Sequence, residues 1–261
     1  SNTAIGAEAL YYTTSDENVG VGDRAGAYTT GDANTYVGFK AGFGASGAEA
    51  NNVGVGHSSL LAITTGSSNV AIGSGAGEVT TSGSANTIVG YQALNGDVDG
   101  DGADNTALGH KALHDSVSPS KNVAIGDSAM RGLAGPANGV ANCVAIGANA
   151  FYGSGDNTTI DTNGTVAIGK DALFSLTTAG TVLGIGFQAL KALTTGVSNH
   201  AIGYQSQLAN VDGVANVSFG RGTLGTNVSG NYNTAIGHQA LETFNNDIDG
   251  ENTAVGMNAG Q

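Results

Sequence analysis

Several residue types that stabilise or identify common protein classes are scarce in this sequence. Its 261 residues include one cysteine, two prolines and no tryptophan, and only 11% of them are charged. Cys143 has no intrachain disulfide partner, which excludes a disulfide-stabilised fold. The scarcity of proline and the lack of a Gly-X-Y period exclude collagen. No apolar run reaches the roughly 18 residues that a membrane-spanning helix requires, so we expect no membrane insertion.

Positive charge is also scarce. Lys and Arg together number 8 against 21 Asp and Glu, and the formal net charge at pH 7 is −13. A protein of this charge repels a phosphate backbone, and no basic patch offsets the repulsion. We therefore expect no nucleic acid among its partners.

Glycine is abundant instead, and it marks an internal repeat. The chain contains 44 glycines, and the pattern Asn-[Thr/Val]-Ala-[Ile/Val]-Gly-x-x-Ala-Leu recurs about every 17 residues. A short fixed period is typical of a solenoid, in which each repeat stacks on the next. Fifteen copies share one glycine, called here the repeat glycine: Gly6, Gly22, Gly38, Gly56, Gly73, Gly90, Gly109, Gly126, Gly147, Gly169, Gly186, Gly203, Gly220, Gly237 and Gly256.

The residues before each repeat glycine predict a short strand. The preceding residue is Ile, Val, Leu or Phe in all copies, and the third before is Val or Thr in all except two, where Leu183 and His200 stand. Because side chains alternate along a strand, these two positions share one apolar face, and Ala or Gly usually occupies the opposite face. We expect the apolar face to supply the core and the small-residue face to lie near contacts with other chains.

Two further positions predict how the chain turns and stacks. The repeat glycine is expected to turn the chain between two short strands, because glycine tolerates positive φ. Asn stands four residues before it in twelve copies, and stacked asparagines can hydrogen-bond along a ladder. Cys143 takes this position in one repeat, where we expect it to be a small space-filling side chain.

These patterns predict an all-β fold, a parallel β-solenoid of about fifteen coils of about 17 residues each. Residues 1–261 form a single repeat array without visible polar caps, which predicts a fragment of a longer fibre. Each coil offers only two or three sizeable apolar side chains, too few for a stable isolated coil. We therefore expect several chains around one axis, with a homotrimer preferred.

The repeat motif resembles those of two groups of fibrous proteins. Asn-Val-Ala-Ile-Gly, at Asn69–Gly73 and Asn122–Gly126, resembles the head repeats of trimeric autotransporter adhesins. The longer unit Asn-Thr-Ala-Ile-Gly-x-Gln-Ala-Leu, at Asn233–Leu241, is similar to repeat arrays of bacteriophage tail fibres. The resemblance implies a left-handed parallel β-roll that assembles, intertwined or side by side, as a homotrimer.

The resemblance also implies a structural or an adhesive function. The first is a segment of a phage or viral tail fibre on the virion surface, which projects a host-receptor-binding tip. The period near 17, longer than that of the adhesin heads, favours this function. The alternative is an extracellular bacterial surface adhesin head that binds a host cell-surface glycan or protein directly. A third alternative is ice binding through stacked threonines, although Thr-Thr pairs occur in only some repeats.

Two longer repeats carry acidic insertions. Asp-x-Asp-x-Asp-Gly resembles the first half of a calcium-binding loop, in which alternate carboxylates converge on one hard cation. The Glu expected at the twelfth loop position is missing, and Leu108 stands there. The insertions therefore predict either a calcium site or a solvated acidic turn. The candidate ligands are Asp97, Asp99, Asp101 and Asp104 in the first insertion, and Asp247, Asp249 and Glu251 in the second.

The position after the repeat glycine is variable and often large. Such side chains in successive coils would form an outward ladder, and rigid amphipathic rings suit the recognition of sugars. The alternative is that they cover the roll or fill gaps between chains. The candidate binding residues are Phe39, His57, Tyr91, His110, Phe187, Tyr204 and His238.

Nothing in the sequence predicts an enzyme. No Ser-His-Asp arrangement with a nucleophile elbow is present. The Gly-x-Gly-x-x-Ala strings at Gly20–Ala25 and Gly184–Ala189 lack the βαβ unit of a dinucleotide site, and calcium is the one cofactor considered. His200 is expected to be buried or between chains, where a threefold axis would place it to bind an ion.

Overall fold

The fold is built from one short strand per repeat. The computed structural model describes residues 1–44, 47–96, 101–133, 140–153, 163–178, 180–244 and 250–260. Within these residues the regular secondary structure consists of fifteen strands of three residues: β1 (Thr3–Ile5), β2 (Val19–Val21), β3 (Thr35–Val37), β4 (Val53–Val55), β5 (Val70–Ile72), β6 (Thr87–Val89), β7 (Thr106–Leu108), β8 (Val123–Ile125), β9 (Val144–Ile146), β10 (Val166–Ile168), β11 (Leu183–Ile185), β12 (His200–Ile202), β13 (Val217–Phe219), β14 (Thr234–Ile236) and β15 (Thr253–Val255).

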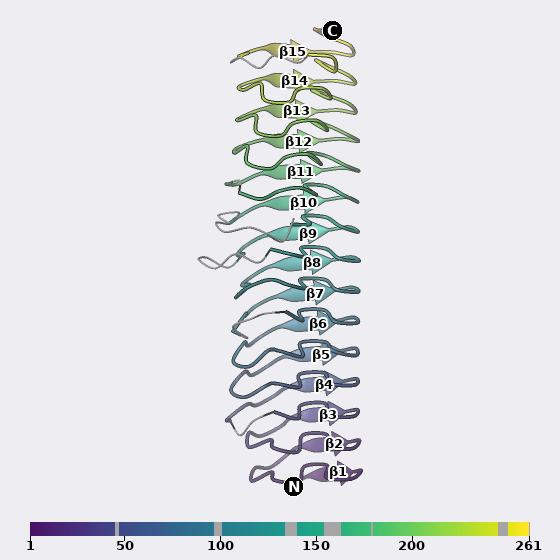
Figure 1. The fold of residues 1–261 in the computed structure, drawn as a ribbon, viewed down its shortest axis with the longest axis vertical. Helices are drawn as coiled ribbons and strands as arrows, with labels where there is room; N and C mark the ends of the chain where they lie inside the picture. Colours follow the sequence, from purple (N-terminus) through teal and green to yellow (C-terminus); the bar gives the residue numbers. More distant parts are fainter. Residues whose placement is uncertain are drawn as a thin grey trace. The chain divides into compact units, whose positions relative to one another are not determined.

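The chain divides into two compact units, each a parallel β-solenoid. The N-terminal unit, Ser1–Ile125, contains β1 to β8, and the C-terminal unit, Gly126–Gln261, contains β9 to β15. In each unit every strand pairs in parallel with the next strand along the chain (Figure 1). The predicted all-β parallel solenoid is thereby confirmed. Its number of coils, its left hand and its trimeric state stay predictions.

The two faces of each strand are the reverse of the predicted ones. In β2 to β15 the middle residue, usually Ala or Gly, is buried, and the first and third residues are half-buried or exposed. Ala71, for example, is fully buried, whereas Ile72 beside it is 42% exposed. The prediction that the Val and Ile face supplies the core was therefore wrong, and so was the placement of the small-residue face near other chains.

The narrow interior explains this reversal. The core side chain across from the strand is usually the Leu four residues after the repeat glycine, and it leaves room only for Ala or Gly. A Cβ added at Gly20 would lie 2.8 Å from Leu10 Cγ. Where the middle residue of a strand is large, the position four residues after the repeat glycine of the preceding coil holds glycine in place of leucine. A Cβ at Gly26, for example, would lie 3.0 Å from the Tyr36 ring. The volumes of the two positions thus complement each other.

The repeat glycine makes the turn that follows each strand. All fifteen repeat glycines have φ between +126° and +141°, which favours glycine strongly. The predicted positive φ is confirmed. However, the described part of each repeat holds one strand and then tight turns, so the prediction of a second strand after the glycine was wrong. The reason is local: residues two and four places after the glycine also take positive φ, as Gln92 and Leu94 do.

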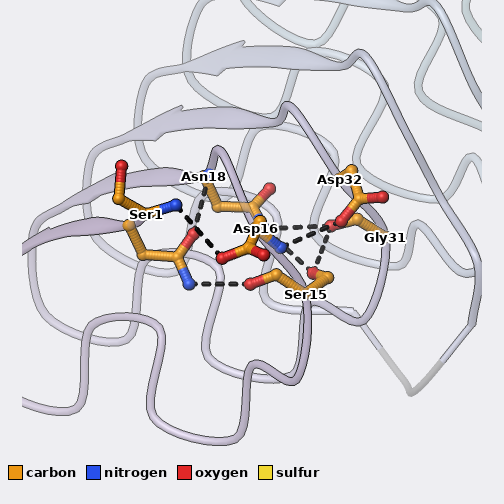
Figure 2. Close-up of polar contacts among 7 residues, drawn as sticks. Ser1, Ser15, Asp16, Asn18, Gly31 and Asp32 are labelled. Carbon is orange, nitrogen blue, oxygen red and sulfur yellow. Dashed lines mark hydrogen bonds and ion pairs between the residues drawn. The ribbon is translucent and has the colours of Figure 1, made fainter.

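A buried ladder of asparagines connects successive coils, as predicted. In the N-terminal unit the Asn18 backbone N–H donates to Asn2 Oδ1 at 2.9 Å, and the Asn34 N–H donates to Asn18 Oδ1 at 2.8 Å. Figure 2 shows the start of this ladder, where Asn18 Nδ2 and Ser15 Oγ both donate to the Gly31 carbonyl. The ladder satisfies buried polar groups inside the roll, where an unpaired donor would be costly.

The asparagine ladder is interrupted at the start of the C-terminal unit. Cys143, Thr165 and Val182 take the asparagine position in three successive repeats, and all three side chains are buried. The prediction that Cys143 is a small buried side chain is confirmed. From Asn199 the ladder resumes, with the Asn216 N–H donating to Asn199 Oδ1 at 3.0 Å.

Candidate functional site

Each unit presents an outward apolar face formed by the first and third residues of its strands. These positions hold Val, Ile, Leu, Phe or Thr everywhere in β1 to β15 except at His200. Since soluble proteins usually bury such side chains, this exposure is unusual. The most exposed large members, with exposed fractions from 36% to 68%, are Ile5, Ile72, Leu108, Ile146, Val217, Phe219, Ile236 and Val255.

The area of the apolar face can be compared with that of apolar patches on other soluble proteins. Three-residue strands are about 10 Å long and lie about 4.8 Å apart, so the eight strands of the N-terminal unit span roughly 400 Å². The largest apolar patch on a soluble monomer typically covers roughly 300–600 Å² and is often functional, so this face is a candidate contact with another molecule. In-register pairing keeps the rows straight, since Val53 lies beside Val70 and Val55 beside Ile72.

The residues that follow the repeat glycines form short aromatic stacks. The ring centroids of Phe39 and His57 are 5.1 Å apart, and those of Tyr91 and His110 are 5.6 Å apart, with interplanar angles of 26° and 10°. The structure therefore brings four of the seven predicted ladder residues into two separate pairs in the N-terminal unit.

A similar stack lies in the C-terminal unit. Phe187 and Tyr204 are 5.3 Å apart at an interplanar angle of 15°, and Arg221 Cζ lies 5.5 Å from the Tyr204 centroid. His238 follows one coil later and is exposed. In each stack the facing ring surfaces cover each other, so a sugar would reach only the outer faces and the ring edges. Sugar binding by these residues stays a prediction.

A second aromatic cluster, not anticipated from the sequence, lies on the first coils. Tyr12 and Tyr28 stack at 5.0 Å, Tyr11 packs edge-on against Tyr12 at 4.5 Å, and Phe43 packs edge-on against Tyr28 at 5.0 Å. Tyr11 and Tyr12 are more than half exposed. The signal was available, because Tyr12 and Tyr28 both stand six residues after a repeat glycine. This cluster adds exposed tyrosine rings to the surface of the N-terminal unit.

The predicted calcium ligands lie mostly outside the described residues. Asp97, Asp99, Asp247 and Asp249 belong to that undescribed part. Asp101, Asp104 and Glu251 are described and are exposed to solvent. Among the described residues there is no group of three or more His, Cys, Asp or Glu side chains that could hold a metal ion within one chain. Calcium binding by the acidic insertions therefore stays a prediction.

One carboxylate is buried inside the N-terminal unit. Glu49 is 2% exposed, and its Oε1 accepts a hydrogen bond from the Thr30 backbone N–H at 3.3 Å. Its Oε2, the Tyr36 hydroxyl and Thr29 Oγ1 are buried without a hydrogen-bond partner among the described residues. Burial disfavours the charged form and raises the pKa of Glu49 to about 7. Sequence reasoning missed this residue because the adjacent repeats have glycine at its position, Gly31 and Gly66, and so do not indicate where a side chain there would point.

This buried carboxylate predicts a pH-dependent stability. A raised pKa means that the folded state holds a proton that the unfolded state releases above about pH 4.5. The stabilising contribution is therefore complete below that pH and is lost as the pH rises through about 7, at about 1.4 kcal/mol per pH unit. The wild type loses this contribution as the pH rises, whereas Gln does not titrate. The free energy of unfolding of Glu49→Gln, measured relative to the wild type at the same pH, should therefore be about 3 kcal/mol higher at pH 8 than at pH 4.5.

Urea denaturation at several pH values measures this gain. The matched control is Glu17→Gln, which removes the same charge from an exposed position of the same unit. A difference between Glu49→Gln and wild type that stays constant across this pH range would contradict the assignment of a buried, protonated Glu49.

The remaining sequence candidates are not brought into a catalytic arrangement. The strings Gly20–Ala25 and Gly184–Ala189 each run from a strand into a turn, without a helix in the described chain on either side. His200 was expected to be buried or between chains; it is exposed on the apolar face of the single chain, which contradicts the first alternative, and the second stays a prediction. The single chain exposes it because the strand faces are reversed.

Comparisons with known proteins identify no relative of the chain. No family model matches the sequence, and no curated protein or solved structure matches it either. Across the described residues, the structure contains no helix long and apolar enough to cross a lipid bilayer.

Proposed function

We propose that the chain is a structural segment of a phage or viral tail fibre, on the virion surface, in which three copies associate and project a host-receptor-binding tip. The observation that carries the proposal is the outward apolar face. A row of exposed Val and Ile side chains is unfavourable in water, and covering it with the same face of other copies removes this cost.

The two rows of the apolar face suggest how three copies fit together. The row of first residues is mostly Val and Thr. The row of third residues is mostly Ile and Val, and its side chains are larger on average. In a closed cyclic assembly, every chain presents the same two rows toward the common axis. With the axis along the stacking direction, each strand meets the equivalent strand of the other copies, and the register is preserved along the array.

Such an assembly serves a mechanical role. Within each unit, backbone hydrogen bonds connect each coil to the next, and the asparagine ladder adds to them wherever asparagine is present, so tension along the stack is carried by many parallel hydrogen bonds. The net charge of −13 favours repulsion between separate fibres. The number of repeats then sets how far the tip stands from the particle.

A bacterial adhesin head that binds a host glycan or protein is the second candidate. The exposed tyrosines around Tyr12 and Tyr28 favour it, because amphipathic rings are well suited to sugar contacts.

Deletion of two whole repeats tests the structural role. Removal of residues 57–90 joins Gly56 to Tyr91 and preserves the repeat register. We expect the particle to shorten by about 10 Å in small-angle X-ray scattering, with the same number of chains. We also expect the full chain to bind no sugar on a glycan array. Array binding that Tyr12→Ala abolishes would favour the adhesin instead, and a particle that loses its assembly after the deletion would contradict a modular shaft.

A further inference from the structure

His200 is the one ionisable residue of the apolar face. It is the first residue of β12 and is exposed. Among the first and third residues of the fifteen described strands, every other side chain is apolar or Thr. Leu183 and Val217 flank His200 in the same row, as the parallel register shows. An imidazole in such a row needs a polar partner when the face is covered, because a buried polar group without one is costly.

The interior behind His200 is also unusual, since it holds a polar network in place of the common leucine and alanines. Gln207 stands where eight repeats have Leu. Its Nε2 donates to the His200 carbonyl at 3.1 Å and to Ser218 Oγ at 2.9 Å, and its Oε1 accepts from Asn210 Nδ2 at 2.9 Å. Ser206 Oγ lies 2.6 Å from Ser218 Oγ. All four side chains of this network are buried.

The network supports the backbone that carries the histidine. The His200 carbonyl accepts hydrogen bonds from inside the roll, and the His200 N–H donates to the Asn216 carbonyl at 2.8 Å. The backbone that carries His200 is therefore anchored on both of its polar groups.

We propose that three His200 side chains, one from each copy of the chain, bind one zinc ion on the axis of the assembly. The inference rests on the proposed function, because the site is complete only when three copies meet. An axis along the stacking direction places the same strand of each copy at the same height, so the three imidazoles face one another. A single chain supplies one ligand.

The chemistry of the site fits a borderline metal ion. Neutral imidazole nitrogen is a preferred ligand of Zn²⁺, and three histidines leave a fourth tetrahedral position for water. Leu183 and Val217 lie beside His200 in the same row and Phe219 lies in the neighbouring row, so apolar side chains would adjoin the three imidazoles in the assembly. The metal gives each imidazole the polar partner that the apolar face lacks. His57, His110 and His238 follow repeat glycines and so lie off this face.

Zinc titration of the tag-free full chain, after removal of metal with EDTA, tests the proposal. The probe is Zn²⁺ alone, with calorimetry for stoichiometry and light scattering for mass. We expect one zinc ion per three chains and a rise in melting temperature on zinc addition, because binding to the folded state stabilises it. His200→Val gives the row the residue found at Val217, and it should keep the assembled mass and lose the zinc site. His238→Asn is the matched control and should keep it.

The outcomes separate this site from the proposed function. A particle of three chains that takes up no zinc, or whose zinc uptake survives His200→Val, would overturn the zinc site and leave the fibre intact. A particle of one chain would overturn both.

Discussion

Gly56→Ala is expected to lower the free energy of unfolding by about 3 kcal/mol or more, an effect of the size that accompanies severe backbone strain. Gly56 has φ +137°, and a Cβ there would lie 2.5 Å from the carbonyl oxygen of Gly73 in the next coil. Both the backbone angle and the contact oppose any side chain. Because the obstructing atom belongs to the backbone of a stacked coil, a side-chain rotation cannot relieve it. Chemical denaturation followed by circular dichroism measures the loss.

Gly75→Ala is the matched control for this substitution. Gly75 also has positive φ, +67°, but its nearest neighbours are side-chain atoms at 3.2 to 3.3 Å. The equivalent position of the next repeat is occupied by Gln92 at φ +51°. We expect a loss of about 1–2 kcal/mol, the usual cost of a left-handed alanine. Equal losses for the two variants would contradict the close stacking of repeat glycines.

Ile72→Glu is expected to convert the assembled particle into single chains. Ile72 is 42% exposed in the single chain, so the substitution removes little of the chain's own core. In the assembly it would place three carboxylates together within an apolar contact, which costs several kcal/mol. Light scattering should report the mass of one chain, and the β-sheet circular dichroism signal at low temperature should persist.

Ser74→Glu separates this effect from that of added charge. Ser74 is exposed and stands two residues further along the same coil, after the repeat glycine and off the apolar face. The variant should keep the mass of the wild type. If Ile72→Glu also kept it, the apolar face would not be the contact between copies.

The sequence was sufficient to predict the solenoid and its asparagine ladder. Both follow from spacing alone, because a residue that recurs once per coil at a fixed position must lie above its equivalent. Asn18 and Asn34 therefore stack in the structure as their spacing indicated. The same logic correctly brought Phe39 beside His57 and Tyr91 beside His110.

Spacing did not determine which face of the strand points inward. Val and Ile are more hydrophobic than Ala, and this ranking favoured the wrong face. The deciding factor is the width of the coil, which depends on how the turn after the repeat glycine places Leu10 or Tyr36 across the interior. The informative signal was the exchange of sizes, with Gly26 where Tyr36 needs space.

Sequence spacing likewise identified some candidate site residues and missed others. Positions that recur in every repeat were found, whereas Glu49 stands where the adjacent repeats have Gly31 and Gly66, and only the folded chain reveals that its side chain is buried. His200 was noticed as an exception in its row, but its polar support comes from Gln207 and Ser218, which adjoin it only in three dimensions.

The proposed association of three copies through the outward Val and Ile rows underlies the proposed fibre, the expected effect of Ile72→Glu and the proposed zinc site alike. Multi-angle light scattering of the tag-free 261-residue chain tests it most directly. A particle of three times the chain mass of 25.5 kDa is the predicted result. A folded, monodisperse particle of 25.5 kDa, with the apolar face open to water, would contradict the account.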